Sequence, residues 1–272
     1  MSSMENISTH VRQMSDSVAG SFYPSDPAHL KRTIDTFMRE ADEHKIDGKL
    51  RALILPHAGY IYSGPVASKG YRLIRNLDMD KTWRVIIIGL SHFRPFSGIS
   101  IGAYDKYATP LGPIPVSSLA RDLLVSSGSF IPEAHENEHS IEVQLPFLKV
   151  ALKHVEIVPI LTSNTKPKML ADLLEPHMDD STLLIASTDL SHMQPDNRAR
   201  ELDASTLNWI IDGDEKLLKK RGQACGMTGI LTMLILSKRL GWKREQVGYA
   251  TSADTHGDKT RVVGYGCVAC YE

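Results

Sequence analysis

The stretch that decides the fold is residues 85–92, Val-Ile-Ile-Ile-Gly-Leu-Ser-His, in which an apolar strand ends just before a histidine. Residues 53–57, Leu-Ile-Leu-Pro-His, repeat this arrangement, and residues 183–189, Leu-Leu-Ile-Ala-Ser-Thr-Asp, end on an aspartate instead. Strands this apolar are typical of parallel sheets that helices cover on both faces. Ligands bind beyond the carboxyl ends of such strands. If the three strands are parallel neighbours, we expect His57, His92, Asp189 and His192 to share one crevice. Imidazoles beside a carboxylate suit a metal site.

Strand and helix patterns alternate along most of the chain. A further strand is expected at residues 156–161, and two β-like runs close the chain at 246–252 and 261–271. This alternation predicts an α/β fold, a single layered domain over residues 17–272 with a mainly parallel central sheet flanked by helices. The two closing runs are expected to add antiparallel strands at one side, and residues 1–16 to form a flexible tail. Helices are expected near residues 27–43, 64–76, 116–127, 138–153, 166–177, 197–211, 214–221 and 225–240.

The composition is that of an ordinary globular protein and excludes several classes of partner. The 272 residues are 42% hydrophobic and 23% charged, with a formal net charge of −1, so nothing indicates binding to nucleic acid or membrane surfaces. The first residues are polar and do not resemble a signal peptide, and no apolar run approaches the ~18 residues of a membrane span. Three cysteines fit a reducing compartment, so we expect a cytoplasmic protein.

Asp189 and His192 form an Asp-x-x-His motif after the third apolar strand. One interpretation is a helix cap followed by a surface histidine, since Ser, Thr and Asp all cap helices well. The other is a carboxylate and an acid/base imidazole that reach one cleft. The residues themselves favour neither interpretation.

Two further residues are candidates for the same cleft. His139 follows acidic residues that favour helix initiation, and at that helix start it could project into the cleft; His135 is the less favoured alternative. Cys225 precedes an apolar helix, where a cysteine most often serves packing, but a helix N-terminus also lowers a thiol pKa and favours metal coordination. Cys267 and Cys270 would point to opposite faces of a strand, so we interpret them as structural.

Six motifs, found in order from about Ala19 to the C-terminus, resemble those of the Memo family. They cover nearly the whole chain, which makes the resemblance specific. The motifs are Ala-Gly-Ser-Phe-Tyr-Pro, Pro-His-Ala-Gly-Tyr-x-Tyr-Ser-Gly, Gly-Leu-Ser-His, Glu-x-Glu-His-Ser-Ile-Glu-Val-Gln-Leu-Pro, Ser-Thr-Asp-Leu-Ser-His and Ala-Cys-Gly.

The resemblance implies a fold like that of class III extradiol dioxygenases, the non-haem iron enzymes that cleave catechol rings. It also implies that His57, His92 and Cys225 are the metal ligands, with Asp189 and His192 lining the same pocket as catalytic residues. His139 is similar to a pocket histidine of the dioxygenase fold and is the third catalytic candidate.

The implied ligand set determines the metals to expect. Class III dioxygenases hold Fe(II) with two histidines and one carboxylate, whereas Cys225 would supply the third ligand here. Two imidazoles and a thiolate suit iron, copper or zinc, and we favour iron, with copper second.

The resemblance therefore predicts a metal-dependent redox enzyme that acts on a small aromatic substrate. The alternative is a non-catalytic protein that uses the same pocket to bind a peptide or a partner. Memo-like proteins of microbes resemble companions of AMMECR-type and radical SAM proteins, which are the partners expected here. A hydrolase is not favoured, because no serine has the strand-turn-helix setting of a nucleophile elbow.

Overall fold

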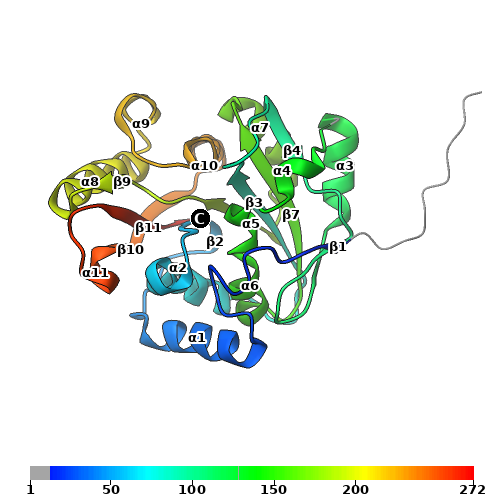
Figure 1. Cartoon of the computed structure of the whole chain (residues 1–272). Helices are drawn as coiled ribbons and strands as arrows, with labels where there is room; N and C mark the ends of the chain where they lie inside the picture. The colour runs from blue at the N-terminus through cyan, green and yellow to red at the C-terminus, as the bar shows by residue number, and fades with distance from the viewer. Residues whose placement is uncertain (1–12, 128) are drawn as a thin grey trace, which may run out of the picture.

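A central sheet of eight strands organises the computed structural model, which describes residues 13–127 and 129–272 (Figure 1). The strand order is β10-β11-β2-β8-β3-β7-β4, with β9 paired to β11. The four strands from β2 to β7 in this order are parallel, whereas β4, β9, β10 and β11 pair antiparallel. The strands are β2 (Leu50–Leu55), β3 (Trp83–Leu90), β4 (Gly98–Ile101), β7 (Val155–Ser163), β8 (Thr182–Ser187), β9 (His192–Gln194), β10 (Lys243–Thr251) and β11 (Val262–Tyr271).

The predicted α/β fold, with parallel strands at the centre of the sheet, is confirmed. The two closing runs do form the antiparallel pair β10–β11 at one side. A small second sheet was not predicted: β5 (Lys106–Tyr107) joins β1 (Gln13–Met14) and β6 (Ile114–Pro115). Of the predicted tail, residues 1–12 lie outside the described residues, and Gln13–Met14 form β1.

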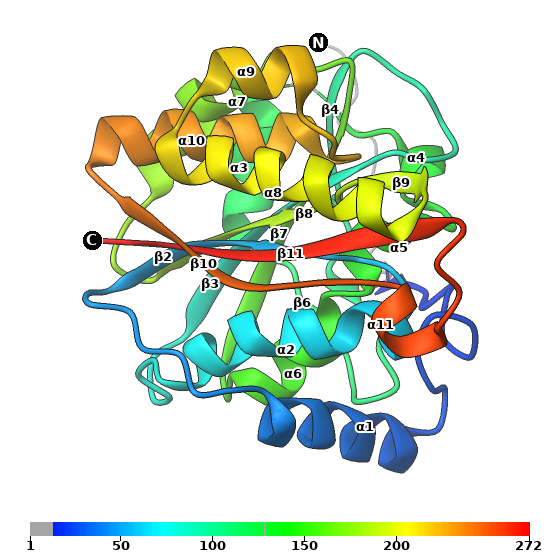
Figure 2. The ribbon, with the colours of Figure 1, turned by 90° about the vertical axis from the view of Figure 1, so that its left-hand side faces the viewer.

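Helices cover both faces of the sheet, as Figure 2 shows, with α1, α2 and α6 on one side and α3, α7, α8 and α10 on the other. Among the described residues, no helix combines the length and apolarity that crossing a membrane requires. The helices are α1 (Pro27–Glu40), α2 (Tyr60–Arg75), α3 (Ser118–Ser127), α4 (Pro132–His135), α5 (His139–Glu142), α6 (Leu145–Ala151), α7 (Pro167–Leu174), the 3-10 helix Glu175–His177, α8 (Asp196–Asp212), α9 (Glu215–Arg221), α10 (Met227–Leu240) and α11 (Ala253–His256).

The two faces of the sheet carry two separate cores. Successive strand residues point to opposite faces, so in β3 Ile87 packs with α1, α2 and α6, while Ile86 and Ile88 pack against α7 and α10. All three isoleucines are almost fully buried, and burying each contributes roughly 1.5–3 kcal/mol. This two-sided burial explains why the strands lack polar residues until their carboxyl ends.

The helix predicted over residues 138–153 is two helices, α5 and α6. Pro146 lies in the first turn of α6, where its missing N–H costs nothing, because first-turn N–H groups have no partner within the helix. Between the two helices, the side chain of Gln144 turns inward and its amide donates to the carbonyl of Pro56, 2.9 Å away. The break therefore joins this segment to the end of β2.

A serine ties α5 to the end of β3. The Ser140 hydroxyl donates to the carbonyl of Leu90 (2.9 Å) and accepts from the Leu90 N–H (3.2 Å). Gly89 allows this approach, because a Cβ there would lie 2.5 Å from the Ser140 Oγ. The contact fixes the strand end that carries His92 against the helix that carries His139.

We therefore predict that Gly89→Ala destabilises the protein by about 1–3 kcal/mol, since the added methyl group forces a well-packed contact apart. Gly229 of α10 is the matched control, because a Cβ there meets its nearest neighbour, Ile88, at 3.3 Å, and alanine favours a helix by ~1 kcal/mol over glycine. Gly229→Ala should change the free energy of unfolding by less than about 1 kcal/mol in denaturant titrations. Equal effects of the two substitutions would contradict this account.

Candidate metal centre

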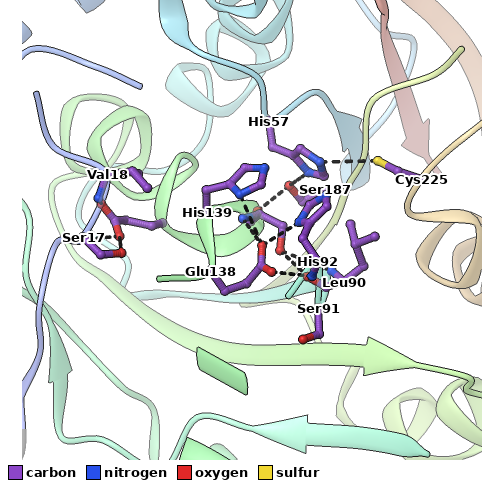
Figure 3. A network of polar contacts seen from close by, with 12 residues as sticks. Ser17, Val18, His57, Leu90, Ser91, His92, Glu138, His139, Ser187 and Cys225 are labelled. Carbon is purple, nitrogen blue, oxygen red and sulfur yellow. Dashed lines mark hydrogen bonds and ion pairs between the residues drawn. The ribbon is translucent and has the colours of Figure 1, made fainter. Parts of the chain in front are cut away.

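Three histidines from different elements converge at the carboxyl ends of the parallel strands (Figure 3). His57, His92 and His139 each offer a ring nitrogen, and these three atoms lie within 4.8 Å of one another. The rings of His92 and His139 stack with centroids 4.2 Å apart, and the ring of His57 meets both edge-on at 5.3 Å. This group could hold a metal ion.

The orientation of His57, which follows β2, is set from two sides. Its backbone N–H donates to the Asp189 carboxylate (2.8 Å), and its Nδ1 lies 3.1 Å from the Ser187 hydroxyl. That hydroxyl donates its hydrogen to the carbonyl of Ser140, so it accepts a hydrogen bond from the His57 Nδ1–H. The His57 Nε2 is therefore the ring nitrogen that faces the Cys225 Sγ, 3.4 Å away.

Glu138 orients His92, as Asp189 and Ser187 orient His57. Its carboxylate accepts from the His92 backbone N–H (2.6 Å) and from the His92 Nδ1 (2.9 Å). It also caps α5 by accepting from the Ser140 N–H (2.8 Å). A carboxylate behind the Nδ1 leaves the Nε2 as the free ligand atom, an arrangement found behind most metal-bound histidines.

Cys225, which precedes α10, completes the cluster. Its Sγ accepts from the Asp189 N–H (3.2 Å) and lies within hydrogen-bonding reach of both His57 and His92. Glycine at position 226 lets the backbone next to Cys225 approach the end of β8, because a Cβ there would lie 2.7 Å from the Ser187 carbonyl oxygen. The loop after β8 and the start of α10 therefore bring the thiol to the histidines.

The N-terminal segment covers one side of the cluster. The buried Glu142 carboxylate accepts from the backbone N–H groups of Ser17 (2.8 Å) and Val18 (2.9 Å) and from the Tyr23 hydroxyl (2.6 Å). These bonds hold the segment in place, and its Phe22 ring packs on the His139 ring with centroids 4.6 Å apart.

The predicted site residues thus divide into two groups. The structure brings together His57, His92, His139, Asp189 and Cys225. His192 is exposed, and its Nδ1 binds the Leu190 carbonyl at 2.9 Å. Over residues 13–127 and 129–272, no polar contact joins the His192 ring to the cluster. The alternative His135 is buried elsewhere, between the hydroxyls of Ser100 and Tyr107.

The cluster is strongly polarised. Burial alone would raise the pKa of the Cys225 thiol, but the His57 and His92 imidazoles lower it to about 5. Burial opposes the charge on His92, yet hydrogen bonds with Cys225 and Glu138 raise its pKa to about 9. The pKa of His139 falls to about 4, because burial and the neighbouring imidazoles both oppose its charge. A metal ion that displaced the proton of His92 would meet a thiolate and a neutral imidazole, which are competent metal ligands.

Sequence reasoning missed the residues that orient the ligands. Glu138 stood within a quoted motif, but its acidic neighbours indicated only helix initiation, and nothing in the spacing predicted its bond to His92. Ser187 was interpreted as a cap candidate, whereas it lies behind His57. The signal for such partners is pairing in space, which one sequence does not contain.

A cavity of about 440 Å³ opens onto this cluster, with His139 and Asp189 in its wall. A larger cavity, about 590 Å³, lies near the amino ends of β2 and β3, beside Leu50 and Trp83. None of the predicted site residues lines that larger cavity. Of these two cavities, only the smaller one borders the histidine cluster.

The donor set fits a transition metal. Two imidazole nitrogens and one thiolate face one another, the histidines have partners behind them, and His57 is 1% exposed. Imidazole and thiolate ligands select iron, copper or zinc over magnesium or calcium.

Comparison with known proteins finds similarity to one family along nearly the whole chain. The family model described as Memo-like protein matches residues 12–269. A MEMO1 family protein of Sulfolobus acidocaldarius is 36% identical, covering 91% of this chain and 95% of its own length. Similar proteins of Methanobrevibacter smithii (36% identical) and Thermotoga petrophila (33% identical) each cover 91% of this chain and 96% of their own length.

The polarised cluster predicts an unusual thiol in metal-free protein. The ultraviolet absorbance of one thiolate should persist from neutral pH down to about pH 5 and disappear below it, because the lowered pKa keeps Cys225 ionised. Cys267 and Cys270 are internal controls, since burial raises their pKa values to about 12 and 11 and they remain thiols. Cys225→Ser should remove the signal. A thiolate that forms only near the ordinary pKa of about 8.5 would contradict the prediction.

Proposed function

Because the chain belongs to the Memo family, we propose that it is a metal-binding protein whose dioxygenase-like pocket serves a metal-dependent redox reaction. One observation carries the proposal: His57 and His92 each have a partner on their Nδ1, which leaves both Nε2 atoms for the centre where Cys225 lies. A packing or purely structural role would not require this arrangement.

In this proposal His57, His92 and Cys225 hold the metal, which is iron in preference to copper or zinc. Bound iron would supply open coordination positions for dioxygen and a small aromatic substrate. Three free cysteines are in accord with a cytoplasmic location, which we propose as well.

The remaining residues orient groups or move protons. Asp189 fixes the backbone of His57 through one carboxylate oxygen and lines the cavity. His139 lies in the cavity wall, and its lowered pKa leaves the imidazole neutral and able to accept a proton from a bound substrate. For His192, the predicted acid/base role would require its exposed ring to move, or a substrate to reach it.

The second candidate function is the binding of a peptide or a partner protein. Exposed apolar side chains favour it: Ile61 is 64% exposed, and Phe93, which follows His92, is 63% exposed. The ring of Phe93 lies 6.3 Å from that of His139, so a partner that contacts Phe93 would lie close to the histidine cluster. AMMECR-type and radical SAM proteins are the partners we propose, on the family resemblance alone.

Anaerobic metal analysis tests the ligand set. Wild-type protein should bind near-stoichiometric iron or copper, and His57→Ala, His92→Ala and Cys225→Ser should each lose it, because each removes a direct ligand. His154→Ala, at an exposed histidine away from the cluster, is the control and should retain the metal. Retention of metal by Cys225→Ser with loss in His139→Ala would replace our ligand set with three histidines.

Dioxygen uptake tests the redox reaction separately. Anaerobically iron-loaded protein should consume dioxygen when mixed with a catechol or small phenol from a panel, and His57→Ala should not. No uptake with any compound would count against the enzyme while leaving the metal site intact. Peptide binding that is unaffected by His57→Ala would favour the binding function instead.

A further inference from the structure

The cavity beside the cluster has aromatic walls. Besides His139, it is lined by Phe22, Tyr62 and Tyr265, which come from three distant parts of the chain. Its volume of about 440 Å³ is within the range of pockets that hold small molecules. Flat rings suit such walls, since aromatic pairs gain attraction beyond the area they bury.

The charged groups that line the cavity differ in how far they are already engaged. Asp189 accepts the His57 N–H, and Asp258 accepts both the N–H and the hydroxyl of Thr260. Arg261 is the one cation in the lining, and within the described part of the chain it has no ion pair or hydrogen bond. A guanidinium without a carboxylate partner at the wall of a pocket is available to an anionic ligand.

We infer that the cavity takes a small aromatic acid, with its carboxylate on Arg261 and its ring between the aromatic walls. This inference rests on the proposed function and names its substrate class. The guanidinium binds a carboxylate through two parallel hydrogen bonds. A single carboxylate is favoured over a doubly charged phosphate, because Asp189 and Asp258 repel additional negative charge. The far end of the ring then points toward His139 and the metal ligands.

Calorimetric titration of the purified protein with two matched probes tests this inference. The probes are 4-hydroxybenzoate and 4-hydroxybenzamide, which share size and shape and differ in charge. Wild-type protein should bind the acid about tenfold or more tightly than the amide, since a charge-assisted pair is stronger than a neutral one. Arg261→Gln should abolish this preference and leave amide binding unchanged.

Lys259→Gln is the matched control, because it removes a neighbouring cation that does not line the cavity. It should keep the preference for the acid. Equal binding of the two probes by wild type, equal losses in both variants, or no binding of either probe would overturn the inference.

Phenyl phosphate tests the number of charges and should bind more weakly than 4-hydroxybenzoate; tighter binding would overturn the carboxylate assignment. Metal content is measured on the same samples, so that an absent metal, which would count against the proposed function, is separated from an absent acid preference.

Discussion

The site depends on how two histidines, His57 and His92, divide their ring nitrogens between partners. The Nδ1 of His57 is bound by Ser187 and that of His92 by Glu138. Among the described residues, the two Nε2 atoms are left with the Cys225 thiol as their one polar partner. Each of these partners is itself held: Ser187 by Ser140 and Gln144, and Glu138 by the Ser140 N–H. Ser140 thus joins the supports of both histidines, and the packing of Gly89 against it links the geometry of the candidate site to the stability of the fold.

Charge explains why such a cluster suits a cation. Without a metal, the thiolate of Cys225 is balanced by protons on the imidazoles, as the raised pKa of His92 shows. A divalent ion that takes the place of those protons satisfies the same thiolate and lets the imidazoles return to their neutral, ligating form. The Glu138 carboxylate remains negative throughout, because the His92 hydrogen bonds outweigh its burial and lower its pKa to about 2. The negative charge of the Cys225 thiolate therefore favours a bound cation for the same reason that it favours protons on the imidazoles.

Sequence patterns predicted the parts of the structure that arise from periodicity. The apolar runs ending at Leu55, Leu90 and Ser187 are parallel neighbours, so His57, His92 and Asp189 do meet at one sheet edge. Family motifs added Cys225, which periodicity alone leaves as a packing residue. The break between α5 and α6 escaped prediction because the apolar spacing continues across it. Glu138, Phe22 and Arg261 escaped prediction because their roles arise from contacts between segments far apart in sequence, and the Asp-x-x-His spacing did not determine that the His192 ring is exposed.

X-ray absorption at the metal edge tests the proposed ligand set, because it identifies the atoms bound to the metal. For protein loaded anaerobically with iron, we expect one sulfur neighbour at about 2.3 Å, together with imidazole nitrogens. The sulfur contribution should vanish in Cys225→Ser, while His154→Ala leaves the spectrum unchanged. A first shell of nitrogen and oxygen alone in the wild type would contradict the His57–His92–Cys225 centre.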